Sequence, residues 1–470
     1  MTIIADQKLP YPIIVGLLSL TTIAAAQPTN VPRWNRAKYL LLDSRIIATV
    51  SGAQLKLGTV TKHRANPMFG DDRPWEGVLD NLYPNVAYDG QADLYKCWYH
   101  SDYPHNGLCY AQSKDGLTWK KPALGLVDYQ GSKQNNILFA GGGHGVGVWL
   151  DHHESNPERR FKMFYMDCRN QNDTSLATRF SRDGIDWSDV NKSSSRPRGD
   201  THNNACWAPT LGKYVGFSRG WPSRTTPSTD PMDDQRVVNR VESTNVLDWS
   251  DPEVVFRGIP TRQTYSMPVF FYSGVYLGLP TILQYDNGSR VHVELAWSPD
   301  TVNWHRIEPD SPLIPLSETK GGYDWGIIYS AVAPIFLENE IRVYYAGGPD
   351  AHLDNTLYDS SLCLATLRPD GFAGYQTEDE DQVGVVTTNP VTCDGALLRI
   401  SADAQGGAVC ISLLDVEGTA VGQAKPVTAD LTDGVISWKD DFELADIRGT
   451  KIRLRFELDN AILYSFSFTD

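Results

Sequence analysis

The amino-acid sequence predicts an all-β protein, a five-bladed β-propeller followed by a C-terminal β-sandwich. Three observations favour this fold: a repeated turn motif, a repeated inner-strand signal and a change of pattern near the C-terminus. Each copy of the turn motif follows a short apolar stretch, and the last copy is degenerate. The copies are 113–119 (SKDGLTW), 181–187 (SRDGIDW), 243–249 (STNVLDW), 298–304 (SPDTVNW) and 368–374 (RPDGFAG).

The turn motif has the chemistry of a tight hairpin. An Asp side chain can accept hydrogen bonds from the backbone ahead of it, and the Gly that follows tolerates positive φ. The tryptophan at the end of the motif offers a large apolar wedge between neighbouring blades. We therefore interpret these tryptophans as part of the architecture rather than as ligand contacts.

A Pro or Gly stands at a matching place before each turn. Proline inside a strand is tolerated where one backbone edge needs no partner, and the innermost strand of a propeller blade has such an edge. These positions therefore predict the inner strands, whose residues line the axial funnel where propellers bind ligands. They are Pro84, Gly147, Pro209, Pro268 and Pro334.

The chain divides into three predicted segments. Residues 1–26 read as a secretory signal peptide, because the apolar run that ends in Ala24-Ala25-Ala26 is short for a bilayer span. A membrane anchor or an uncleaved tail is the alternative. Residues 27–382 are the predicted propeller, and residues 383–470 alternate apolar and polar residues as a β-sandwich does. We expect a secreted or periplasmic protein with no membrane partner after cleavage.

Composition excludes several classes of function. The net charge is −15, the isoelectric point is near 5.1, and no Lys/Arg-rich run occurs, so nucleic acid and anionic membranes are not expected partners. Seven cysteines without a CxxC motif give no support for a zinc ribbon or a thioredoxin-like site. Cys97 with Cys109, and Cys393 with Cys410, are either disulfides or buried free thiols. We expect no metal and no cofactor, and the oligomeric state stays open.

Polar groups converge on the predicted axis from every blade. Carboxylates that lie close together push their pKa values apart, which is what glycoside hydrolysis needs for its acid and its base or nucleophile. We therefore expect a glycosidase that acts on oligosaccharides. The candidate catalytic residues are Asp80, Asp200 and Asp324. The candidate substrate-binding residues are Glu76, His144, His202, Asn203, Arg262, Tyr265 and Trp325.

Other interpretations of these residues stay open. Each Asp could simply cap a turn or pair with an Arg, and Glu294 is a second-tier candidate because it falls on a third strand. A non-catalytic carbohydrate-binding propeller is one alternative. A polysaccharide lyase is another, with His202 or Tyr265 as the base and Arg262 neutralising a uronate.

The chain resembles the five-bladed β-propeller glycosidases of glycoside hydrolase families 32 and 43. The blade turns and the trailing sandwich carry this resemblance. Four tracts also look like secreted family 32-like bacterial proteins: 66–86 (NPMFGDDRPWEGVLDNLYPNV), 199–209 (GDTHNNACWAP), 262–269 (RQTYSMPV) and 323–334 (YDWGIIYSAVAP).

The resemblance implies an acid/base pair and a tuning carboxylate on the inner strands. It places Asp80 as the first-blade nucleophile or base. The invertase tract WMNDPNG, the Arg-Asp-Pro motif and the Glu-Cys motif are absent, and Asp200 stands where a glutamate acid is expected. Specificity for fructan or sucrose is therefore not implied. A funnel closed at its base favours exo action.

Overall fold

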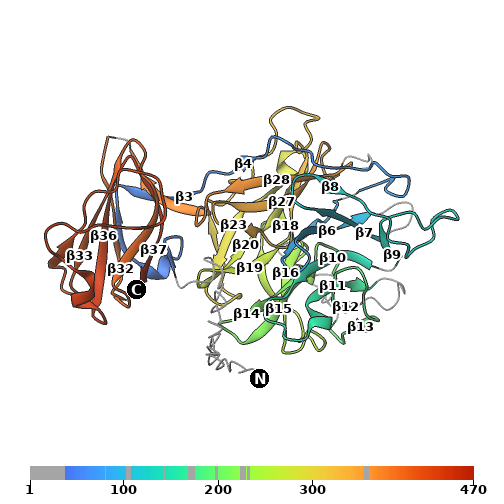
Figure 1. Cartoon of the computed structure of the whole chain (residues 1–470). Helices are drawn as coiled ribbons and strands as arrows, with labels where there is room; N and C mark the ends of the chain where they lie inside the picture. The colour runs from blue at the N-terminus through green and yellow to red at the C-terminus, as the bar shows by residue number, and fades with distance from the viewer. Residues whose placement is uncertain are drawn as a thin grey trace, which may run out of the picture.

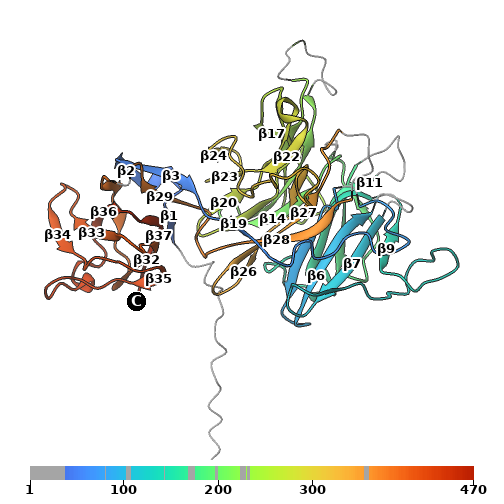
Figure 2. The same ribbon diagram turned by 90° about the horizontal axis from the view of Figure 1, so that it is seen from above.

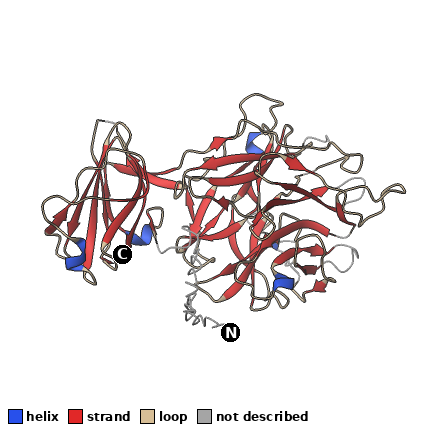
Figure 3. Ribbon diagram, viewed as in Figure 1, coloured by secondary structure: helices blue, strands red, loops and turns tan. Residues whose placement is uncertain are grey.

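The computed structural model describes residues 38–79, 81–101, 107–141, 143–167, 175–195, 199–222, 229, 233–353, 359–379 and 381–470. Regular structure in these residues is almost entirely β, and the helical elements are short 3-10 turns (Figure 3). The predicted all-β class is confirmed. The predicted signal peptide lies outside the described residues. No helix within the described ranges has both the length and the apolar character to cross a bilayer.

Two bodies are visible, a larger one built of radially arranged sheets and a smaller one near the C-terminus (Figure 1). Four sheets of the larger body are antiparallel, and the strands of each follow chain order. The first consists of β5 (Asn85–Asp89), β6 (Leu94–Ser101), β7 (Gly107–Ser113) and β8 (Trp119–Lys120), with β9 (Ile137–Ala140) also paired to β7. The second consists of β10 (Gly143–Leu150), β11 (Phe161–Asp167), β12 (Ser175–Ser181) and β13 (Asn191–Lys192).

The same order recurs along the chain. The next sheet consists of β14 (Asn204–Ala208), β15 (Lys213–Gly220), β16 (Val237–Ser243) and β17 (Glu253–Arg257). It is followed by β19 (Val269–Tyr272), β20 (Val275–Gly278), β23 (Leu295–Ser298) and β24 (His305–Ile307). This up-and-down order is that of propeller blades. The number of blades stays a prediction.

The last sheet of the larger body is completed by the beginning of the chain. It contains β18 (Arg262–Ser266), β21 (Thr281–Gln284), β22 (Arg290–Val293), β25 (Ile327–Ser330), β26 (Ile335–Phe336), β27 (Ile341–Gly348), β28 (Ser361–Leu367) and β4 (Thr61–Lys62). Strand β4 pairs with β28 at its outer edge, with Lys62 opposite Ala365. An early strand thus closes against a late one, which protects an edge that would otherwise be open.

The smaller body is a sandwich of two six-stranded sheets. One contains β1 (Tyr39–Leu40), β3 (Ala53–Leu57), β29 (Ala373–Thr377), β32 (Leu397–Asp403), β35 (Leu431–Val435) and β37 (Ile462–Thr469). The other contains β2 (Ile47–Ser51), β30 (Gly384–Thr388), β31 (Val391–Thr392), β33 (Ala408–Leu414), β34 (Ala420–Gln423) and β36 (Lys451–Asp459).

The composition of the sandwich differs from the predicted segments. Residues 39–57 and 373–377 fall in the segment predicted as propeller, yet they pair with sandwich strands, and Figure 2 shows the N-terminal strands among the C-terminal ones. The physical reason is shared burial: Ala53 and Tyr375 pack in one core with Val409 and Phe456. A short alternating strand carries no local sign of which body it will join.

The repeated turns are built as the motif predicts. In the first, Asp115 Oδ1 accepts hydrogen bonds from the backbone of Leu117 at 2.8 Å and Thr118 at 2.7 Å, and Gly116 has φ 73°. Asp183, Asn245 and Asp300 make the same pair of bonds.

The tryptophans pack between neighbouring sheets, as expected. The ring centroids of Trp249 and Phe164 on β11 are 4.8 Å apart, and those of Trp119 and Tyr344 on β27 are 5.9 Å apart. The four cysteines considered for disulfides, Cys97, Cys109, Cys393 and Cys410, are free thiols.

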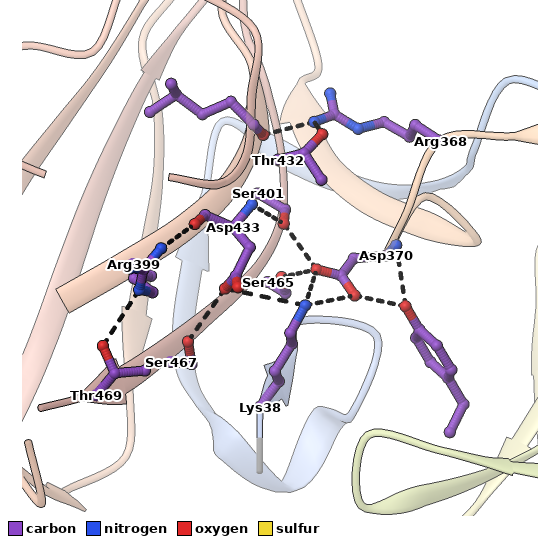
Figure 4. Close-up of polar contacts among 12 residues, drawn as sticks. Lys38, Arg368, Asp370, Arg399, Ser401, Thr432, Asp433, Ser465, Ser467 and Thr469 are labelled. Atoms are coloured by element: carbon purple, nitrogen blue, oxygen red, sulfur yellow. Dashed lines mark hydrogen bonds and ion pairs between the residues drawn. The ribbon is translucent and has the colours of Figure 1, made fainter. Parts of the chain in front are cut away.

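A buried ionic cluster joins the two bodies (Figure 4). Asp370 is fully buried and accepts hydrogen bonds from Lys38 Nζ at 3.0 Å, Tyr272 at 2.6 Å, Ser401 at 2.7 Å and Ser465 at 2.8 Å. Tyr272 lies on propeller strand β19, whereas the two serines lie on sandwich strands β32 and β37. We call these five residues the junction cluster. Both carboxylate oxygens of Asp370 have partners, so the burial of its charge is compensated.

Candidate active site

Tyr83 lies just before the innermost strand β5 and is held there by an unusual backbone. Asn81, Leu82 and Tyr83 have φ values of 51°, 50° and 41°, in the left-handed region that residues with a Cβ seldom occupy. The segment is fixed by bonds from its surroundings: the His100 N–H donates to Leu82 O at 2.8 Å, and Asn85 Nδ2 donates to Tyr83 O at 2.9 Å. Such strained segments are often found at functional sites.

The Tyr83 ring is the centre of a cluster of aromatic rings. Its centroid lies 5.1 Å from that of His202, 5.9 Å from that of His144 and 6.0 Å from that of Tyr329. Tyr329 continues the cluster to Tyr265, at 5.1 Å between centroids.

Two more histidines complete the ring contacts. The His100 ring lies 5.5 Å from the His144 ring, and the His352 ring lies 4.8 Å from the Tyr265 ring. His352 Nδ1 and the Tyr329 hydroxyl are 3.3 Å apart. With the charged groups Asp200, Arg219 and Arg236 described next, these seven rings form what we call the axial cluster.

Five members of the axial cluster lie on or directly before five different strands. Tyr83 precedes β5, His144 lies on β10, His202 precedes β14, Tyr265 lies on β18 just before β19, and Tyr329 lies on β25. Ring contacts through Tyr83 and Tyr329 bring together three of the predicted substrate-binding residues, His144, His202 and Tyr265.

Asp200 is the exposed carboxylate of the axial cluster. Its Oδ1 lies 3.1 Å from His144 Nε2, its Oδ2 lies 3.1 Å from Arg219 Nη1, and its side chain is 64% exposed. Desolvation by its surroundings would raise the pKa of Asp200, but the His144 hydrogen bond and the Arg219 charge outweigh it and lower that pKa to about 2. Asp200 is therefore ionised at neutral pH.

Two histidines of the axial cluster are neutral at neutral pH. Burial lowers the pKa of His202 to about 3 and that of His352 to about 4. His202 Nε2 lies 3.2 Å from Asn85 Oδ1, which also accepts the Val148 N–H at 2.8 Å. A neutral imidazole can act as a base or as a hydrogen-bond donor to a bound hydroxyl.

Two arginines share the face of Tyr265. The guanidinium carbon of Arg219 lies 4.3 Å from the ring centroid and that of Arg236 lies 5.7 Å from it. Arg219 is almost fully buried, and its Nη2 donates to Tyr265 O at 3.2 Å. The cluster thus combines one ionised carboxylate with two cations and stacking surfaces, which is a chemistry suited to a polar ring-shaped ligand.

Glu76 and Asp324 have a different setting, in which each is fully buried beside a lysine. Glu76 Oε2 lies 2.6 Å from Lys121 Nζ, and Tyr99 donates to Glu76 Oε1. Burial raises the pKa of Glu76, and Lys121 opposes this shift.

Asp324 has the same kind of surroundings. Its Oδ2 lies 2.6 Å from Lys62 Nζ and accepts the Tyr345 hydroxyl at 2.9 Å, while Ser317 donates to Oδ1. This is the environment of a structural ion pair, and a catalytic role for Asp324 stays a prediction.

The remaining predicted residues fall in several places. Asp80 lies outside the described residues. Asn203 joins two sheets, since its Nδ2 donates to the backbone of Gly145 at 2.9 Å while its Oδ1 accepts the Ser218 hydroxyl at 2.6 Å. Arg262 pairs with Asp286 and Asp310 at 2.9 Å each.

Trp325 and Glu294 also have partners of their own. The half-buried Trp325 ring is flanked by Arg290 and Lys320, at 5.4 and 5.5 Å from the ring. Glu294 is buried and paired with Arg306 at 2.7 Å and His292 at 3.1 Å. A structural ion pair explains Glu294.

Sequence reasoning missed six members of the axial cluster. Two could have been noticed, because Tyr83 directly precedes the inner-strand Pro84 and Tyr329 lies within the tract 323–334. The other four lie on a strand that is not the first of its sheet or in a loop beside such a strand. No sequence motif marks these places. The missed residues are Tyr83, His100, Arg219, Arg236, Tyr329 and His352.

No family model and no curated protein matches the chain. Among solved structures, it is similar to a glycosyl hydrolase from Bacteroides ovatus, at 13% identity, covering 66% of this chain and 93% of that one, with a TM-score of 0.45. It is also similar to a glycoside hydrolase family 43 arabinoxylan arabinofuranohydrolase from Bacillus subtilis, at 11% identity, covering 86% and 97%, with a TM-score of 0.41.

A third similar structure comes from the GH130 family of mannoside phosphorylases, which contains glycoside hydrolases that target β-1,2 mannosidic linkages in Candida mannan. The identity is 14%, the coverage is 67% of this chain and 94% of that one, and the TM-score is 0.47. All three similarities combine low identity with a modest TM-score, so no activity is transferred from them to this chain.

Proposed function

We propose that this protein is a secreted or periplasmic glycoside hydrolase that trims oligosaccharides of a complex polysaccharide from their ends. The observation that carries the proposal is Asp200: an ionised, solvent-exposed carboxylate beside a wall of histidine and tyrosine rings. Glycoside hydrolysis needs one ionised carboxylate to attack the sugar or activate water, and tyrosine faces suit the apolar face of a sugar ring.

The proposal assigns distinct roles to Asp80 and Asp200. Because its pKa is lowered to about 2, Asp200 is the base or nucleophile and not the proton donor. Asp80, which directly precedes the strained segment 81–83, is the proposed acid. His144 holds the orientation of Asp200 through its Nε2.

The test is sugar release from a panel of oligosaccharides and aryl glycosides by the chain from Gln27 onward. Asp200→Asn and Asp80→Asn should both abolish release. Asp310→Asn is the matched control, because Asp310 is also an exposed aspartate paired with an arginine, at 2.9 Å from Arg262. Release that survives Asp200→Asn would refute the proposal. Fractionation of the source cells tests the predicted location.

A lyase is the second candidate, favoured by one specific observation. The described part of the axial cluster holds more tyrosine and histidine than carboxylate, and Arg219 lies beside Tyr265. In that reaction Tyr265 or His202 would remove a proton next to a uronate carboxylate that an arginine neutralises. An unsaturated, ultraviolet-absorbing product in the same assay would identify the lyase. Tight binding without any product would identify a carbohydrate-binding propeller.

A further inference from the structure

The axial cluster carries more positive than negative charge within its described residues. Asp200 contacts both His144 and Arg219, whereas the guanidinium carbon of Arg236 lies 5.7 Å from the Tyr265 ring centroid. The polar partners of Arg236 Nη1 are neutral: Gln263 Oε1 at 3.1 Å and the Tyr285 hydroxyl at 2.7 Å. Its guanidinium also lies 5.0 Å from the Trp221 ring.

Both arginines keep a buried nitrogen without a partner. Arg219 Nε and Arg236 Nε are shielded from solvent, and neither makes a hydrogen bond in the described structure. Leaving a buried donor unsatisfied is costly, particularly on a charged group. Arg219 itself is only 3% exposed, so the unmatched donors lie inside the site rather than on a freely hydrated surface.

Arginines of the neighbouring strands show the contrast. Arg262 contacts two carboxylates, Asp286 and Asp310, and Arg306 contacts Glu294. In a chain with a net charge of −15, carboxylates are abundant enough to pair a surface arginine. Arg236 is set apart because the side chains that accept its hydrogen bonds are neutral, although its charge also acts on Asp200.

The charges of Arg219 and Arg236 both act on His352. After burial, which is the largest cause, these two arginines lower the pKa of His352 to about 4. The His352 ring centroid lies 4.8 Å from that of Tyr265. The positive charge of both guanidinium groups therefore also acts on groups beside Tyr265. The negative charge of Asp200 opposes the two arginines, as the smallest of the causes. An anionic group placed beside Tyr265 would meet two cations and a neutral histidine, with one carboxylate nearby.

We propose that the sugar bound at the axial cluster is acidic, with its carboxylate or sulfate held by Arg236 and, behind it, by Arg219. This inference rests on the proposed function, because it names the substrate class of the same site. A planar guanidinium binds either anion through two parallel hydrogen bonds, and its unused Nε supplies one of these donors. The Trp221 and Tyr265 rings lie beside these donors and offer surfaces for the sugar ring.

The experiment measures binding by calorimetry, so it does not depend on turnover. The probes are a uronate-ended oligosaccharide, a sulfated one and their neutral counterpart. The variants are Arg236→Gln and Arg236→Lys, with Arg182→Gln as the control, because Arg182 is 72% exposed on an outer turn. Arg236 is chosen over Arg219 because it is less buried and its loss strands no carboxylate.

Arg236→Gln should weaken binding of the acidic probe by about 10- to 100-fold and leave the neutral probe unchanged. Arg236→Lys should recover only part of that loss, since an ammonium cannot bind in a bidentate manner. Comparing the carboxylated and sulfated probes identifies which anion is preferred. Equal affinity of the wild-type protein for acidic and neutral probes, or an unchanged preference in Arg236→Gln, would overturn the inference.

The two proposals fail separately. Hydrolysis of neutral sugars that needs Asp200 but ignores Arg236 would overturn the acidic substrate and leave the glycoside hydrolase. Binding of the acidic probe that needs Arg236, without hydrolysis of any sugar, would overturn the hydrolase and leave the acid-binding site.

Discussion

The junction cluster and the axial cluster are both polar groups enclosed by the β-structure, and they differ in how completely their partners are matched. At the junction, one carboxylate, Asp370, accepts from a lysine and three hydroxyl groups and has no exposed surface. At the axis, Asp200 is 64% exposed, while Arg219 Nε and Arg236 Nε lack partners. A saturated cluster can only stabilise the fold, whereas an unsaturated one has bonds left for a ligand.

This difference gives a criterion for separating structural carboxylates of this chain from candidate functional ones. Burial does not mark a functional group here, because Glu76 and Asp324 are the more buried candidates and both are neutralised by a lysine. Incomplete pairing next to exposed surface is the more informative sign. By that criterion Asp200 is the stronger candidate for a functional group, whereas the surroundings of Asp324 resemble those of Asp370.

Asp200→Asn should give the largest effect of all. We expect kcat/KM on the best substrate to decrease by about 10²- to 10⁴-fold, because the base or nucleophile is lost. Stability should decrease less than in Asp370→Ala, since the Asp200 side chain is exposed and the Asn amide oxygen can still accept a hydrogen bond from the buried Arg219. Kinetics and urea unfolding of the same preparation check both parts. A variant that unfolds as readily as Asp370→Ala would remove the contrast between the clusters.

The pH dependence of kcat/KM tests the same assignment of Asp200. The folded pKa of Asp200, about 2, lies below the usual aspartate value, so the group stays ionised as pH falls from neutral through the weakly acidic range. We expect any acid limb of kcat/KM above pH 4 to come from another group. An acid limb that disappears in Asp200→Asn alone, with residual activity measured, would contradict this assignment.

Asp370→Ala should cost about 3–5 kcal/mol of unfolding free energy, because it leaves the buried Lys38 with only the more distant Asp433 Oδ1, at 3.9 Å, and removes the acceptor of three hydroxyl groups. The measurement is chemical denaturation, followed separately for the propeller and sandwich transitions. Glu417→Ala, at an exposed sandwich turn, is the control. A loss below 1 kcal/mol would show that the junction cluster is not the tie between the two bodies.

Asp324→Asn tests whether Asp324 is structural like Asp370. We expect a loss of about 1–3 kcal/mol, since an amide still accepts a hydrogen bond but no longer balances the Lys62 charge. Activity per folded molecule should stay within about threefold, well short of the loss expected when a catalytic acid or base is removed. A large loss of activity in fully folded protein would instead make Asp324 catalytic, as the sequence suggested.

His202 provides the smallest effect at neutral pH, and one that grows as pH falls. Its folded pKa, about 3, lies below its unfolded value, so the unfolded state binds more protons once pH falls below the ordinary histidine range. Stability should therefore be highest above that range and decrease steadily toward pH 3. His202→Gln should flatten this slope, which stability curves at several pH values would detect. Proton uptake by the His202 ring near pH 6, seen by NMR, would contradict the prediction.

Much of the fold could be predicted because its signals are local. The turn at Asp115 is made by bonds to residues two and three positions ahead, and the same chemistry repeats at Asp183 and Asp300. The alternating C-terminal strands likewise show their buried face in their own sequence, as β36 does with alternate burial of its side chains. Both features require no knowledge of distant residues.

The candidate site could be predicted only in part. His144, His202 and Tyr265 lie on or beside inner strands, whose positions the Pro and Gly signals mark. Arg219 and Arg236 escaped notice because β15 and the loop before β16 carry no such signal. Their meeting at Tyr265 depends on the packing of separate sheets.

By itself, the sequence determined the β class, the turns and the tryptophan wedges, because short-range hydrogen bonds and side-chain alternation encode them. Only the tertiary structure decided which charges are neutralised. Lys121 pairs with Glu76, which lies 45 residues earlier in the chain. Lys62, on the early strand β4, pairs with Asp324, which lies far later in the chain. It also decided that strands 39–57 join the sandwich. Such pairings join residues that are distant in the sequence, so they depend on the tertiary fold and leave no local sequence pattern.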